Sequence, residues 1–154
     1  MRTAARRSYR PSMVLEAFIR DEHGPVRLDL TDFHGGWTLI VFFPPGMADH
    51  PELAAFERLR RHFTDEDCLV VAASIDSWWQ LRDAQASFPL VADTHALLAM
   101  AFGAYDQGDA RFGWVLLDPA GAVRESDLED GPCAMCALEA LRTLRDRPSL
   151  RLVS

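Results

Sequence analysis

The 154-residue chain contains no lysine and no asparagine. Without lysine it cannot form a Schiff base or carry a Walker A phosphate loop, and without asparagine it has no N-glycosylation acceptor. No apolar run reaches the roughly 20 residues that span a bilayer, so no membrane partner is expected. The formal net charge of −7 argues against a nucleic-acid partner. A biased codon supply is the simplest reason for the missing residue types.

Cysteine is also scarce, because Cys68, Cys133 and Cys136 are the only three. Three cysteines are too few for a disulfide scaffold, and the five histidines lack the spacing of a metal site.

The basic first residues precede no long apolar segment, so we do not expect them to be a secretion signal. We therefore expect a flexible basic arm at 1–12, one domain at 13–147, a tail at 148–154 and a cytoplasmic location.

Strand and helix patterns alternate along the rest of the chain. Apolar or alternating runs predict strands at 26–32, 37–43, 68–75, 88–92, 112–117 and 122–125. Helices are predicted after an Asp49 N-cap, from Asp76 to about Ala86, from Asp93 through Ala101, and from about Pro132 to Arg145. This order indicates the α/β class, with a mixed central sheet between helices on both faces.

Short sequence segments in a fixed order carry a family resemblance. They are LTDFHGG at 30–36, LIVFFP at 39–44, ELAAF at 52–56, VVAASIDS at 70–77, FPLVAD at 88–93 and WVLLDPAG at 114–121. From about Val26 to Arg145 the chain resembles the peroxiredoxin (alkyl hydroperoxide reductase / thiol-specific antioxidant) family of the thioredoxin fold. The resemblance implies a thioredoxin-like three-layer sandwich and antioxidant oxidoreductase chemistry that needs no cofactor and no metal.

The sequence departs from this family where the peroxide site belongs. The family places a proline after the strand, a Thr or Ser four residues on, and the peroxidatic cysteine three further on, but the eight residues after Pro44 contain no Thr, Ser or Cys. The resemblance puts the cysteine position at Asp49, or alternatively at His50, just before Glu52. Neither side chain can form a sulfenic acid. Arg111 stands one residue from the position where the family carries its arginine. The resemblance therefore makes five residues degenerate or supporting positions of a peroxide site: Pro44, Asp49, His50, Glu52 and Arg111.

The segment Gly-Pro-Cys133-Ala-Met-Cys136 is the most informative thiol motif. A C-x-x-C in the first turn of a helix lowers the pKa of the first thiol and permits a reversible disulfide. The resemblance places this helix start at the same sheet edge as the end of the strand at 37–43. Our first hypothesis is an enzyme in which Cys133 attacks a hydroperoxide or disulfide and Cys136 resolves the product. A thioredoxin-type protein or a small-molecule thiol would supply the electrons.

Other readings stay open. Cys133 and Cys136 can instead be small buried residues of the helix. The missing Cys, Thr and Ser after Pro44 motivate a second hypothesis, a catalytically inactive protein that binds a ligand or partner. A metal site made by both cysteines and His50 is a third hypothesis. Cys68 at the start of a strand is predicted to be core. An exposed tryptophan in the pair at 78–79 would indicate a homodimer surface.

Overall fold

The computed structural model describes residues 14–18, 26–29, 35–48, 50–81, 88–129 and 133–146. The predicted terminal arm and tail and Asp49 lie outside these ranges, as do the side chains of the tryptophans at 78–79. Among the described residues, no helix has both the length and the apolar character needed to cross a membrane.

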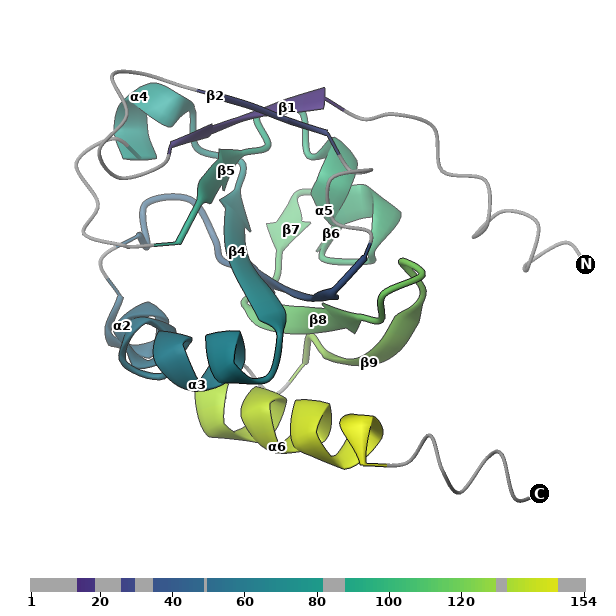
Figure 1. The fold of residues 1–154 in the computed structure, drawn as a ribbon. Coiled ribbons are helices and arrows are strands. Elements are labelled where there is room, and N and C mark those ends of the chain that lie inside the picture. Colours follow the sequence, from purple (N-terminus) through teal and green to yellow (C-terminus); the bar gives the residue numbers. More distant parts are fainter. Residues whose placement is uncertain are drawn as a thin grey trace, which may run out of the picture.

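A seven-stranded mixed sheet forms the centre of the described molecule, in the order β2-β1-β5-β4-β3-β8-β9 (Figure 1). The strands β3, β4 and β5 run parallel, whereas β8 is antiparallel to β3 and β1 is antiparallel to β5. Their bounds are β1 Val14–Phe18, β2 Val26–Asp29, β3 Trp37–Phe42, β4 Cys68–Ser74, β5 Leu90–Ala92, β8 Gly113–Leu117 and β9 Val123–Asp127. The predicted α/β class and mixed sheet are confirmed, while β1 was not predicted.

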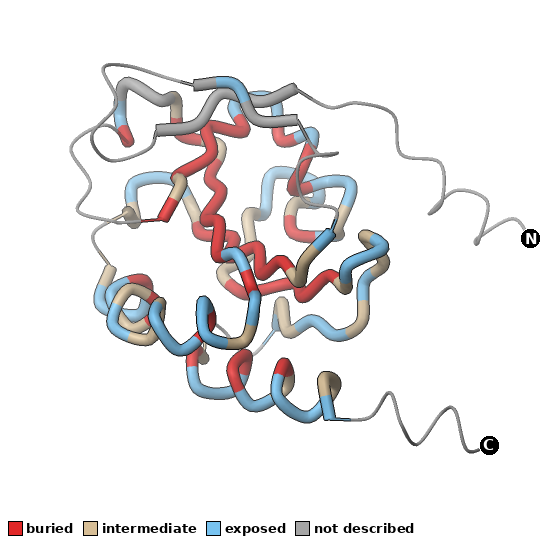
Figure 2. The backbone as a smooth tube through the Cα atoms, in the orientation of Figure 1, coloured by how far each residue is buried: buried red, intermediate tan, exposed pale blue. Residues whose placement is uncertain are grey.

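Helices cover both faces of this sheet. On one face lie α2 (Pro51–Arg58), α3 (Arg60–Asp65), α4 (Trp78–Leu81) and α6 (Ala134–Arg145), whose apolar side chains share one core cluster with alternate residues of β3, β4 and β8. The other face packs α5 (Leu97–Ala101) against the remaining residues of the same strands. Figure 2 shows burial concentrated in the central strands, and this explains why their sequences read as continuous apolar runs.

Two predicted helix starts are corrected. His50, not Asp49, is the N-cap of α2, and its Nδ1 accepts a hydrogen bond from the Glu52 N–H at 3.1 Å. The cause is Pro51, which suits the first helical position and forces the preceding residue into the extended conformation that an N-cap needs. The helix predicted from Pro132 begins instead at Ala134, with Cys133 as its N-cap.

Further differences concern the helices and strands that follow α2. The single helix predicted after Asp49 is divided at Leu59 into α2 and α3. The helix predicted from Asp93 begins at Leu97, yet the buried Asp93 carboxylate still accepts the amides of Leu98 and Ala99, at 3.0 and 2.8 Å. A small ribbon of β6 (Tyr105–Asp106) and β7 (Asp109–Ala110) was not predicted.

Candidate redox site at the start of the last helix

The loop after β3, where the family carries its peroxidatic cysteine, is tied to the end of β4. The Asp76 carboxylate is 5% exposed and accepts hydrogen bonds from the Gly46 N–H at 2.9 Å and the Ser74 hydroxyl at 3.0 Å. The Pro44 carbonyl accepts the Met47 N–H at 3.3 Å, which closes a turn. This loop is therefore fixed in place although residues 44–50 contain no thiol.

His50 has a structural role in this loop. Besides capping α2, its ring meets the ring of Phe112 edge-on, with centroids 5.1 Å apart. Glu52 is exposed, and its backbone N–H is the group that His50 caps. The contacts of His50 thus explain its presence by packing and capping, and they link the loop to the start of β8.

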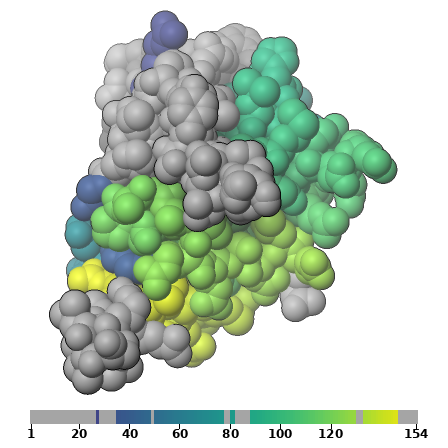
Figure 3. All heavy atoms as spheres, turned by 90° about the vertical axis from the view of Figure 1, so that its right-hand side faces the viewer, coloured from purple at the N-terminus to yellow at the C-terminus, as the bar shows by residue number. Residues whose placement is uncertain are grey.

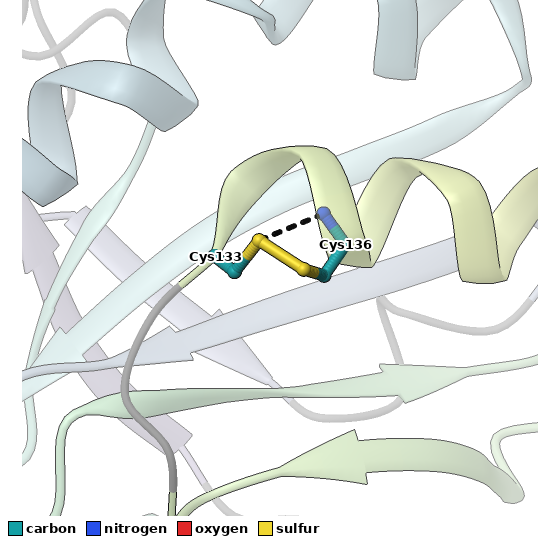
Figure 4. The surroundings of a disulfide bond; sticks show 2 residues. All are labelled: Cys133 and Cys136. Atoms are coloured by element: carbon teal, nitrogen blue, oxygen red, sulfur yellow. Dashed lines mark hydrogen bonds between the residues drawn. A yellow bond between two sulfur atoms is a disulfide. The ribbon is translucent and has the colours of Figure 1, made fainter.

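The structure joins Cys133 and Cys136 in a disulfide at the start of α6 (Figure 4). Their Cα atoms are 5.1 Å apart, and the Cys136 N–H donates a hydrogen bond to the Cys133 Sγ at 3.1 Å. Cys133 is partly buried, whereas Cys136 is exposed. After reduction, the same N–H and the helix dipole favour a thiolate on Cys133.

A hollow of about 560 Å³ adjoins the disulfide, and Cys136 contributes to its wall. The other residues that line it are Gly103, Arg111, Trp114, Glu125, Ser126, Asp127, Leu128 and Glu129. In Figure 3 the green and yellow-green atoms of the segment from β8 to α6 occupy the lower part of one face, beneath the projecting α5–β7 segment. The wall of the hollow thus combines residues as far apart in the sequence as Gly103 and Cys136.

Trp114 lines the hollow, but its indole nitrogen is buried. Its side chain belongs to the core and is 2% exposed, and its indole Nε1–H has no hydrogen-bond partner among the described residues. A buried donor without an acceptor is costly in a folded protein.

Arg111 connects the family's peroxide-site position with the disulfide. It lines the hollow that Cys136 borders, and the structure gives its guanidinium no ion pair with any described residue. The next residue, Phe112, contacts His50. Of the predicted site residues, the structure thus brings Arg111 together with Cys136, while Pro44 and Glu52 stay in the loop and the first turn of α2.

Gly113 shapes the hollow and was not singled out from the sequence. A Cβ at this position would collide with the Asp127 carbonyl oxygen and would lie 2.8 Å from the Leu128 Cα. Only glycine lets the end of β9 pass this close to the start of β8, and that passage supplies one wall of the hollow.

Cys68 is a core residue, as predicted. It is 5% exposed, and burial raises the pKa of its thiol to about 12. It lies at the start of β4 beside a separate hollow of about 310 Å³, at the sheet edge where the parallel strands β3 and β4 begin. A thiol that stays protonated at neutral pH is a poor nucleophile, so Cys68 does not replace the missing cysteine.

The metal hypothesis gains no support from the geometry. Within the described ranges, no group of three or more His, Cys, Asp or Glu side chains is arranged to hold a metal ion. The two sulfurs that it requires are bonded to each other, and a disulfide offers no thiolate ligand.

Known proteins share both this fold and this sequence pattern. The chain is 31% identical to thioredoxin peroxidase of Fasciola hepatica, a match that covers 76% of this chain and 68% of the relative. Peroxiredoxin TSA1-B of Candida albicans is 29% identical, with 75% and 66% covered. The chain thus spans about two thirds of the length of these relatives.

Solved structures agree on the fold. AhpC of Enterococcus faecalis superposes with a TM-score of 0.82 at 22% identity, covering 91% of this chain and 92% of that one. The mitochondrial 2-Cys peroxiredoxin of Plasmodium falciparum gives a TM-score of 0.77 at 17% identity, with 90% and 93% covered. The family model "AhpC/TSA family" matches residues 11–126, so its match ends before the Cys133–Cys136 disulfide. By sequence and by fold, this chain belongs to the AhpC/TSA family of peroxiredoxins.

Proposed function

We propose that the protein is a thiol-dependent oxidoreductase in which Cys133 and Cys136 do the work of the peroxidatic cysteine missing after β3. Membership of the AhpC/TSA family supports thiol-dependent peroxide reduction in general. The observation that carries the proposal is the disulfide at the start of α6, with exposed Cys136 on the wall of a hollow. A disulfide that is partly open to solvent is accessible to thiol exchange.

Cys133 is the attacking thiolate in this proposal. As the N-cap of α6 it lies at the positive end of the helix dipole, and its Sγ accepts the Cys136 N–H. Both features stabilise a thiolate more than a thiol. Cys136 is within bonding distance of Cys133 and serves as the resolving thiol.

The reaction with a hydroperoxide proceeds in two steps. The Cys133 thiolate attacks the terminal peroxide oxygen, the O–O bond breaks, and the alkoxide or hydroxide leaves with a proton as an alcohol or water. The Cys136 thiol then attacks the Cys133 sulfenic sulfur, which forms the disulfide and releases water. The dithiol has lost two electrons and two protons to the peroxide.

A disulfide substrate would use the same pair. The Cys133 thiolate forms a mixed disulfide and expels one thiol, and Cys136 attacks Cys133 to expel the second. In either case a thioredoxin-type protein or a small-molecule thiol restores the dithiol. The cytoplasmic location and the homodimer expected from the sequence stay predictions.

The test is to treat the reduced protein with one equivalent of hydrogen peroxide and to count its free thiols. Two thiols should disappear, with a new bond between Cys133 and Cys136. Cys133→Ser should abolish peroxide consumption, whereas Cys136→Ser should leave a sulfenic acid on Cys133 that a dimedone probe traps. Cys68→Ala is the matched control and should behave like the wild type. An unchanged thiol count would refute the proposal.

A second candidate is a protein that binds a partner and has no catalytic activity. It is favoured by the loop after β3, where residues 44–50 carry no thiol and His50 acts as a helix cap. A Cys133→Ser/Cys136→Ser double variant that retains full biological activity would support this candidate over the first.

A further inference from the structure

The proposed function leaves open which reductant reopens the disulfide and which sulfur it attacks. Resting on that function, we propose that the hollow beside Cys136 admits a low-molecular-weight thiol that carries both a carboxylate and an ammonium group. Its thiolate attacks Cys136, and Cys133 is the leaving group.

The position of each sulfur favours attack at Cys136. Cys136 is exposed and lines the hollow, whereas Cys133 is partly buried and does not line it. In thiol–disulfide exchange the better leaving group is the sulfur whose thiolate is more stable. The Cys136 N–H that reaches the Cys133 Sγ stabilises Cys133 in that role.

One group in the hollow would recognise a carboxylate. The Arg111 guanidinium lines the hollow and is free of ion pairs with described residues. A guanidinium donates charge-assisted hydrogen bonds to a carboxylate, and both oxygens can accept at once. Binding such a group would give Arg111 a partner of opposite charge.

The rest of the wall would recognise an ammonium group. Glu125 and Glu129 are exposed carboxylates on the wall that β9 and the residues after it provide. A purely anionic thiol would therefore be repelled by part of the hollow, and a purely cationic thiol would leave Arg111 without a partner. A thiol with both charges matches both sides.

The size of the hollow indicates a small molecule. Its volume of about 560 Å³ lies within the range of sites for small ligands, ~300–1,000 Å³. A docked protein reductant needs about 800 Å² of surface on each partner, which is a different kind of site.

The exchange balances over two molecules of thiol. The thiolate of the first forms a bond to the Cys136 Sγ, the Cys133–Cys136 bond breaks, and its electron pair stays on the Cys133 Sγ as thiolate. A second thiol molecule attacks the small-molecule sulfur of this mixed disulfide and releases the Cys136 thiolate. The products are the reduced protein and the disulfide of the small thiol, with two electrons transferred.

The experiment compares glutathione, which carries both charges, with thioglycolate, cysteamine and 2-mercaptoethanol on the oxidised full-length protein. The second-order rate constant of each thiol is corrected for the fraction present as thiolate and for the intrinsic nucleophilicity of that thiolate. Glutathione should react about tenfold faster than the neutral thiol, which is the effect expected of one charge-assisted hydrogen bond partly open to water. Cysteamine and thioglycolate each carry only one of the two charges, so each should exceed the rate of 2-mercaptoethanol by less than tenfold.

Variants test the recognition groups. Arg111→Gln should lower the ratio of the glutathione rate to the 2-mercaptoethanol rate by about tenfold. Arg124→Gln is the matched control, because Arg124 pairs with Asp118 and lies outside the hollow, so it should keep the wild-type ratio. A ratio near one in the wild type, or an equal fall in the Arg124 variant, would overturn the proposed recognition.

The attacked sulfur is identified separately. The mixed disulfide with limiting glutathione is trapped with iodoacetamide, and cleavage after Arg124 and Arg142 releases one peptide with both cysteines. Fragmentation between them should place glutathione on Cys136 and the alkyl group on Cys133. The reverse placement, or reduction by thioredoxin but not by glutathione, would overturn this inference while the proposed function stands. A disulfide that no reductant opens would instead overturn the proposed function.

Discussion

Cys68 is expected to be unreactive in the folded, reduced protein, even though it is one of only three cysteines. Burial raises the pKa of its thiol from 9.0 to about 12. A rise of three units lowers the thiolate fraction at pH 8 about a thousandfold relative to an exposed thiol, and the 5% exposure of Cys68 slows reagent access further. Iodoacetamide at pH 8 should therefore label Cys133 and Cys136 within minutes and leave Cys68 unlabelled.

The same pKa shift predicts a loss of stability at high pH. A thiol whose pKa is higher in the folded state than in the unfolded state stabilises the fold fully below pH 9, and this contribution is lost as the pH rises toward 12. The loss amounts to at most a few kcal/mol. Because the chain has no lysine and only two tyrosines, few other groups titrate in this interval. Urea unfolding of the oxidised protein between pH 8 and pH 11 measures the effect.

A Cys68→Ala variant provides the control, since its stability should depend less on pH above 9. The reasoning is refuted if Cys68 is alkylated in the native protein as fast as in urea, or if wild type and variant lose stability equally above pH 9. Either result would mean that the Cys68 thiol ionises in the folded protein and could act as a nucleophile.

Three further predictions concern a close backbone approach, a buried carboxylate and a pair of ion pairs. Gly113→Ala should lower the free energy of unfolding by about 2 kcal/mol or more in urea, because the added Cβ collides with the Asp127 carbonyl. Asp76→Ala should cost about 1–3 kcal/mol and speed hydrogen exchange at the Gly46 amide, which loses its acceptor. Glu66→Gln removes ion pairs to two arginines of α6 and should cost less than about 1 kcal/mol, with no difference from the wild type at 1 M salt.

Each of these changes has a control or a contrary outcome. Gly36→Ala should be nearly neutral, because its Cβ would be 3.5 Å from the nearest atom, the Asp67 carbonyl oxygen. Equal losses at both glycines would contradict the close approach at Gly113. Asp65→Ala, at an exposed carboxylate, should not alter exchange at Gly46. A loss above about 2 kcal/mol for Glu66→Gln would show that its ion pairs are shielded from water.

The central strands could be predicted from the sequence because both of their faces are buried. In β3 and β8 nearly every residue is apolar, and such runs need no tertiary information to be recognised. By contrast, β1 has five residues and pairs with β5, more than 70 positions away, so its stability depends on a distant partner. The two-residue strands β6 and β7 are too short for any periodic signal.

Only the part of the candidate site that lies within one short segment of the sequence could be predicted. The C-x-x-C motif and the helix that it opens are a continuous signal, and both are present in the structure. The unpaired indole of Trp114 and the requirement for Gly113 depend on how β8 and β9 pack, which no local pattern encodes. His50 was missed as a cap because the usual preference pointed to Asp49, and Pro51 shifts the helix start by one residue.

The disulfide joins residues only three positions apart. A disulfide that closes so small a ring removes little conformational entropy from the unfolded chain. Breaking it therefore lowers the free energy of unfolding far less than breaking a disulfide between remote strands would. Neither core cluster contains Cys133 or Cys136, and the sheet is held together by its own strand pairing. In the proposed reaction, the bond between Cys133 and Cys136 would therefore open and close over many cycles while the architecture around it stays intact.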